Sequence, residues 1–165
     1  QLARMLALSA VPLGIECKVV DSEPQGCAAE VADFYCRDWQ QEGALADLLA
    51  CRLAQGLNPV LVTVHSFTPV YFGQPRAVEF GVIHDADDRL ARAIARQETG
   101  LLTRLNEPYS AADGVAHMLA RHATPLGLPH AMLEIRNDLI ATPEAEAGMA
   151  ARLAPAILAA IDEVG

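Results

Sequence analysis

Apolar residues occur along the chain in two kinds of pattern, short continuous runs and longer stretches with helical spacing. Continuous runs rich in β-branched residues are typical of buried strands, and apolar positions recurring every three or four residues indicate helices. We predict strands at 15–20, 34–36, 60–65, 77–83, 101–105 and 130–136. We predict helices at 2–13, 28–32, 43–55, 87–98, 112–123 and 143–164. This alternation predicts an α/β fold, a three-layer sandwich around an open, largely parallel sheet.

Two of the predicted helices carry further signals. The helix at 43–55 places its leucines on one face and meets a glycine, Gly56, where it should end. The last helix contains Pro155, which lacks a backbone donor and should kink or split the helix.

Two ionisable residues interrupt otherwise apolar strands. The run 60–64 leads directly into His65, and Glu134 lies inside the run 131–136. Burying such groups costs free energy, and the carboxyl edge of a parallel sheet is where functional groups gather. A metal-ligating imidazole and a general-base carboxylate are therefore one interpretation. A hydrogen-bonded histidine at a strand end, and a carboxylate paired with Arg136, are the plainer ones.

Charge and length limit the possible partners. The chain has 165 residues, enough for one domain, and a net charge of −9 with a pI near 4.9. An acidic chain is unsuited to nucleic acid or to an anionic membrane surface. No apolar run is long enough to span a membrane, and Pro12 and Gly14 interrupt the leader-like start. We expect a cytoplasmic protein that acts on a small molecule, with a sequence that is partial because it begins at Gln1.

The four cysteines show no metal-binding spacing. No CxxC motif is formed by Cys17, Cys27, Cys36 and Cys51. We expect free, buried thiols in a reducing compartment.

Several longer motifs occur in a fixed order between about residues 49 and 158. They are His65-Ser-Phe-Thr-Pro69, Gly81-Val-Ile-His84-Asp-Ala-Asp-Asp-Arg89-Leu-Ala, Asn106-Glu-Pro-Tyr-Ser110, Asp113-Gly114, Arg121-His122-Ala and Gly127-Leu-Pro-His130-Ala-Met-Leu-Glu134-Ile-Arg-Asn-Asp-Leu-Ile140. This stretch resembles the N-formylglutamate amidohydrolase family, which is similar to zinc-dependent carboxypeptidases. The resemblance implies a phosphorylase/hydrolase-like sandwich.

The resemblance also implies a reaction and roles for individual residues. The reaction would be zinc-dependent hydrolysis of the C–N bond of a small N-acyl, above all N-formyl, amino acid. His65 would be a zinc ligand, and Glu134 would be the general base that takes a proton from water. Substrate contacts would come from Arg136 or Arg89, which suit a carboxylate, and from Asn106 and Tyr109 in a loop.

Residues 1–49 resemble a different protein, the amino-terminal segment of the ATP-grasp subunit of phosphoribosylaminoimidazole carboxylase. We therefore expect a chimera of segments 1–49 and 50–165 in one α/β domain, joined within 43–52. No histidine occurs before His65, so the family's amino-terminal zinc ligands should be missing. The alternatives are a non-catalytic α/β chimera or fragment, or a remnant of the carboxylase subunit. An incomplete sheet would favour self-association.

Overall fold

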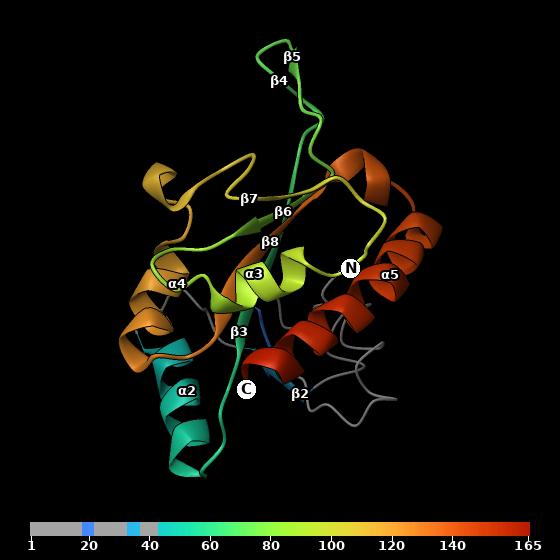
Figure 1. The fold of residues 1–165 in the computed structure, drawn as a ribbon. Coiled ribbons are helices and arrows are strands. Elements are labelled where there is room, and N and C mark those ends of the chain that lie inside the picture. The colour runs from blue at the N-terminus through green and yellow to red at the C-terminus, as the bar shows by residue number, and fades with distance from the viewer. Residues whose placement is uncertain (1–17, 22–32, 37–42) are drawn as a thin grey trace.

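The computed structural model describes residues 18–21, 33–36 and 43–165. A four-stranded sheet lies at its centre, in the order β3 (Leu61–Phe67), β8 (His130–Arg136), β6 (Phe80–Ile83) and β7 (Thr103–Leu105) (Figure 1). β3 pairs with β8, and β6 with β7, in parallel, whereas β6 and β8 are antiparallel. The prediction of a largely parallel sheet is confirmed.

One face of this sheet is covered by two helices, α3 (Arg89–Ala95) and α5 (Pro143–Val164) (Figure 1). The main hydrophobic core lies between them and the strands. Its largest buried side chains are Phe80, Val82, Leu90, Ile94, Leu133, Ile135 and Leu153. Each such side chain contributes about 1.5–3 kcal/mol when fully buried, so this layer stabilises most of the fold.

The opposite face of the sheet meets α4 (His117–His122) and α2 (Ala44–Ala54) through two smaller clusters. Leu119 of α4 packs on Ile83 and Met132. Leu49 of α2 packs on Ala123 and Leu128, and the helix ends near Gly56 as predicted. Helices therefore flank the sheet on both sides, which confirms the three-layer architecture.

A small hairpin follows β3 and projects beyond the end of the sheet (Figure 1). Its strands are β4 (Val70–Tyr71) and β5 (Gln74–Pro75), joined by Phe72 and Gly73 at φ values of 47° and 75°. Positive φ at both turn residues is the geometry of a type I′ turn. The sequence did not predict this hairpin, because Phe-Gly lacks the Asn-Gly or Asp-Gly signal.

Several predicted elements are shorter in the structure than expected. The strand at 77–83 begins only at Phe80, and the helix at 87–98 is confined to α3. The helix expected at 112–123 is a 3-10 turn, Ala111–Asp113, followed by α4. Gly114 between them has a φ of 77°, a left-handed conformation that interrupts a right-handed helix.

The last helix, α5, has the predicted bounds and contains Pro155. α5 runs without a break through Pro155, so the expected splitting is wrong. Pro155 is exposed, and so is Ala151, whose carbonyl has no Pro155 N–H to accept from. Water can satisfy that carbonyl, which lowers the cost of the proline.

The amino-terminal part of the chain is described only at β1 (Lys18–Asp21) and β2 (Asp33–Cys36), a parallel pair that confirms the expected strand at 34–36 and overlaps the one at 15–20. The helices expected at 2–13 and 28–32 lie outside the described residues. Cys51 is free and exposed, so the expectation of a buried thiol is wrong there. None of the described helices is long and apolar enough to cross a membrane.

Candidate active site

The two ionisable residues that interrupt the apolar strands lie side by side in the sheet. His65 of β3 and Glu134 of β8 are direct partners in the parallel register. Their predecessors, Val64 and Leu133, belong to the core beneath α3 and α5. Because successive side chains alternate between faces, His65 and Glu134 emerge together on the opposite face, from strands about 4.8 Å apart. The structure thus brings together the imidazole and the carboxyl that the sequence indicated.

Glu134 is a buried carboxyl, and few hydrogen bonds offset the cost of removing it from water. Its residue is 5% exposed, and its Oε2 atom has no hydrogen-bond partner among the described residues. Burial raises the pKa of Glu134 to about 7, although the positive charge of Arg76 acts in the opposite direction. Near neutral pH this carboxyl is therefore poised between its protonated and ionised forms, which suits a group that accepts and returns a proton.

The pKa of His65 is shifted in the opposite direction to that of Glu134. Partial burial of the imidazole lowers the pKa of His65 below its ordinary value of 6.5. At neutral pH the ring is therefore predominantly neutral and has one nitrogen lone pair available. The residue itself is exposed, so this nitrogen is open to a ligand.

Arg76, which was not among the predicted site residues, is the cation beside this pair. Its guanidinium carbon lies 4.3 Å from the ring centre of Tyr71, 5.1 Å from that of Tyr109 and 5.7 Å from that of Phe67. Its Nη1 donates to the Tyr109 hydroxyl at 3.3 Å. No sequence signal marks this arginine, because it follows the hairpin and its three aromatic neighbours come from separate segments.

Tyr109 is one of the predicted substrate contacts, and the structure places it against Arg76. Its loop crosses the sheet at Gly81, the β6 partner of Glu134. A Cβ at position 81 would lie 2.1 Å from the backbone oxygen of Glu107 and 3.3 Å from the Cβ of Glu134. Glycine is therefore required there, because it lets the loop that carries Tyr109 pass over the strand beside Glu134.

Asn106 in the same loop is held by His84 at the end of β6. Its Oδ1 accepts from the His84 backbone N–H at 3.0 Å, and its Nδ2 lies 3.1 Å from His84 Nε2. His84 Nδ1 faces the carbonyl oxygen of Asp85 at 2.8 Å and must donate to it, so Nε2 is the acceptor for Asn106. The observed contacts make Asn106 a link between two strand ends, and its substrate role stays a prediction.

The two arginines predicted to bind substrate are already paired. Arg89 donates to Asp87 at 2.6 Å and to the Gly127 carbonyl oxygen at 3.0 Å. Arg136 donates to Asp138 at 2.8 Å and lies 3.7 Å from Glu79. These partners offset the positive charges that would otherwise bind a substrate carboxylate, and the substrate roles of both arginines stay predictions.

The zinc ion implied by the family resemblance needs three protein ligands and one open position. Among the residues that the structure describes, no cluster of three or more His, Cys, Asp or Glu side chains could hold a metal ion. His65 can supply one imidazole, and Glu134 is the carboxyl beside it. These residues alone do not fit a zinc ion.

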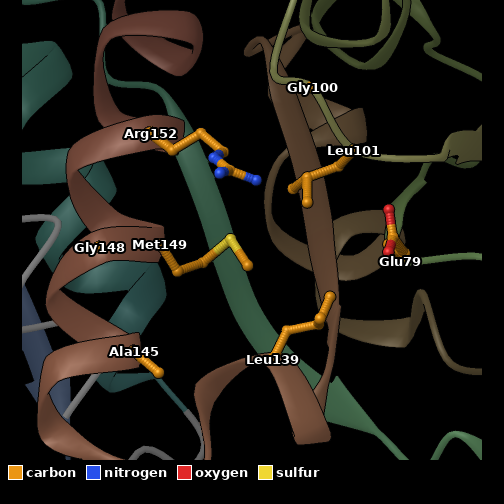
Figure 2. Close-up of a pocket in the computed structure, with 8 residues that line it drawn as sticks. All are labelled: Glu79, Gly100, Leu101, Leu139, Ala145, Gly148, Met149 and Arg152. Atoms are coloured by element: carbon orange, nitrogen blue, oxygen red, sulfur yellow. The ribbon is translucent and has the colours of Figure 1, made fainter.

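A pocket of about 340 Å³ lies elsewhere, between α5 and the segments before β6 and β7 (Figure 2). Arg152 and Met149 of α5 line one side and Leu101 the other, with Glu79 and Leu139 nearby (Figure 2). Met149, Leu101 and Leu139 belong to the core on the face opposite to Glu134. None of the predicted site residues lines this pocket, so it is separate from the His65–Glu134 pair.

Fold and site together define a class of protein. It is a three-layer α/β protein in which a neutral imidazole and a desolvated carboxyl lie side by side toward the carboxyl ends of two parallel strands. A cation caged by aromatic rings lies beside the carboxyl. Such a face can bind an anionic small molecule and move a proton next to it.

Comparison with known proteins gives the family. Residues 23–141 match the N-formylglutamate amidohydrolase family, and the chain belongs to it. The chain is also similar to a solved structure, the crystal structure of gene product Atu2144 from Agrobacterium tumefaciens, with 44% sequence identity and a TM-score of 0.70. That match covers 73% of this chain and 48% of the other, so the chain spans about half the length of this relative. No curated protein matches the chain.

The family match revises the expectation of a chimera. It begins at residue 23, so it crosses the expected junction at 43–52 and includes about half of the segment assigned to a carboxylase subunit. The comparisons provide no support for the carboxylase resemblance. The simpler description is one family segment that extends through residues 23–141.

Proposed function

We propose that this chain carries the proton-transfer part of an N-formylglutamate amidohydrolase-like active site. The substrate is a small N-formyl or other N-acyl amino acid, and the reaction is hydrolysis of its C–N bond. The observation that carries the proposal is Glu134, a buried carboxyl with a pKa of about 7 beside His65 and Arg76. Family membership supports the reaction type.

The proposed chemistry uses Glu134 and water. Ionised Glu134 takes a proton from a water molecule as the water oxygen bonds to the formyl carbon. Glu134 then returns that proton to the amide nitrogen, the C–N bond breaks, and the products are formate and the free amino acid. A base with a pKa near the working pH does both halves of this transfer well, because neither protonation state is strongly favoured.

His65 has a distinct part in the proposal. Its neutral imidazole faces the same space as Glu134 and is suited to be one ligand of the zinc that the family resemblance implies. The described residues do not complete a zinc site, so no step of the proposed reaction is written through the metal. Self-association stays a prediction, with β3 at one edge of the described sheet.

An assay of N-formylglutamate hydrolysis by the purified chain tests the proposal. The reaction is measured by the release of formate and glutamate. Glu134→Gln keeps the shape of the side chain but cannot accept the proton, so we expect a loss of roughly 100-fold or more in kcat. Glu98→Gln, at an exposed position, is the matched control and should retain full activity. Equal activity of wild type and Glu134→Gln would contradict the assignment of the base.

A further inference from the structure

Arg76, the arginine next to Glu134, has different neighbours from the other arginines of the candidate site. Arg89 and Arg136 each lie within ion-pair distance of a carboxylate. Within the part of the chain that the structure describes, Arg76 forms no such ion pair, and its nearest neighbours are aromatic rings. A guanidinium surrounded by aromatic faces is held in place without having its charge neutralised.

The donors of Arg76 are only partly used. Nη1 donates to the Tyr109 hydroxyl at 3.3 Å and lies 3.5 Å from the Thr68 carbonyl oxygen. Among the described residues, Nε and Nη2 have no hydrogen-bond acceptor. These two donors point along one edge of the planar guanidinium, the edge that forms a two-point contact with a carboxylate.

The backbone of Arg76 is fixed from two sides. Its N–H donates to the Pro69 carbonyl oxygen at 2.7 Å across the base of the hairpin. Its own carbonyl oxygen accepts from Arg136 Nη1 at 3.3 Å, and the Ala77 carbonyl oxygen accepts from the same atom at 3.3 Å. Arg136 therefore has a positioning role, because it holds the segment that presents Arg76.

We propose that Arg76, held between Tyr71, Tyr109 and Phe67, binds the carboxylate of the substrate and selects N-acyl amino acids over neutral amides. The guanidinium is close enough to Glu134 for its charge to act on that carboxyl. A substrate held by Arg76 through its carboxylate therefore has its acyl nitrogen near the base. This inference rests on the proposed function, since it names the residue that gives that site its specificity.

Binding of glutarate, a dicarboxylate without a scissile bond, tests the inference independently of catalysis. The probe is titrated into the full chain while the arginine side-chain Nε–H signals are followed by NMR. We expect a saturable shift of the Arg76 signal, and at least a tenfold weaker affinity in Arg76→Met. Arg96→Met, which removes an exposed arginine paired with Glu163, is the control and should bind glutarate like wild type.

A conservative variant separates charge from geometry. Arg76→Lys keeps the positive charge but not the planar fork, so its affinity should lie between those of wild type and Arg76→Met. Glutaramide, the neutral analogue, should produce no saturable shift. Wild-type affinity for glutarate in both Arg76 variants would overturn the inference.

Kinetics distinguish this inference from the proposed function. In Arg76→Met, the KM for N-formylglutamate should rise tenfold or more with a smaller change in kcat. Hydrolysis with an unchanged KM would overturn the role of Arg76 and leave the proposed function standing. Glutarate binding that depends on Arg76, without any hydrolysis, would support the carboxylate site and contradict the proposed function.

Discussion

The backbone oxygen of Glu107 lies over Gly81, only 2.1 Å from where a Cβ would be at that position. Gly81 lies on β6, an inner strand of the sheet, next to Glu134, so the loop that carries Tyr109 passes directly over the strand beside this carboxyl. The contact fixes the loop relative to the carboxyl.

Replacing this glycine should therefore affect both stability and the site. Gly81→Ala places a methyl group against backbone, which cannot rotate away, and we expect the free energy of unfolding to fall by about 1–3 kcal/mol. Chemical denaturation measures the change. Gly148→Ala is the matched control, because a Cβ there meets nothing within 4 Å in an exposed part of α5. It should stabilise the chain by about 0.5–1 kcal/mol. Equal effects of the two substitutions would contradict the close contact at Gly81.

The buried carboxyl of Glu134 should make stability depend on pH. Its pKa is about 7 in the folded chain and 4.5 in the unfolded chain, so the unfolded state binds fewer protons between these values. The contribution of Glu134 to stability should therefore be greatest below the unfolded pKa and fall by roughly 3 kcal/mol as pH rises through 7. Denaturation of wild type and Glu134→Gln at pH 5 and pH 8 measures the effect. The variant should lack this fall, and a parallel fall in both proteins would show that another group is responsible.

The buried pair of His130 and Asp85 should stabilise the fold at neutral pH. The His130 ring is fully buried, with Nδ1 2.7 Å from the Leu128 carbonyl oxygen and Nε2 2.8 Å from Asp85 Oδ1. Burial acts to raise the pKa of Asp85, but hydrogen bonds from Thr124 and His130 outweigh it, so the pKa lies below its ordinary value. This contribution is present at neutral pH and is lost as pH falls through the lowered pKa.

Breaking that pair should destabilise the chain. Asp85→Asn removes the charge opposite a buried imidazole, and we expect a loss of about 3 kcal/mol at pH 7. The difference from wild type should narrow in strong acid, where the wild-type carboxyl is itself protonated. Asp88→Asn, which alters an exposed carboxylate paired with Arg92, should change stability little. A similar loss in both variants would argue against a special role for the buried pair.

Features that depend on neighbouring residues in the chain could be predicted from the sequence, whereas contacts between distant segments could not. The bounds of β8 and α5 follow from local signals, a continuous apolar run for the strand and a Thr142–Pro143 start for the helix. The pairing of His65 with Glu134 could be anticipated, because both residues interrupt strands of the same parallel sheet.

Other features depend on contacts that no local pattern reveals. The cage of Arg76 joins a hairpin, a strand end and a distant loop, so no single stretch of sequence indicates it. The pairing of Arg89 with Asp87 depends on side-chain orientation, and the same residue types would equally have permitted a free cation. The family resemblance therefore pointed to arginines whose charges are already offset in the structure.

The residues that the structure describes should bind zinc only weakly by themselves. One imidazole beside a carboxyl is a poor site for an ion that prefers three protein ligands. We expect dialysis against a mild chelator to remove zinc, with little difference between wild type and His65→Ala in elemental analysis. Zinc that survives dialysis at about one ion per chain, and is lost in His65→Ala, would contradict this expectation. It would show that residues beyond the described ones complete the site.

The pH dependence of kcat/KM for N-formylglutamate tests the central claim most directly, because it reports the protonation state of the base in the free enzyme. Glu134 with a pKa of about 7 predicts an acid limb in which kcat/KM rises with pH and levels off above that value. A kcat/KM that stays constant between pH 5 and pH 8, or a limb centred near the ordinary glutamate pKa of 4.5, would contradict Glu134 as the base.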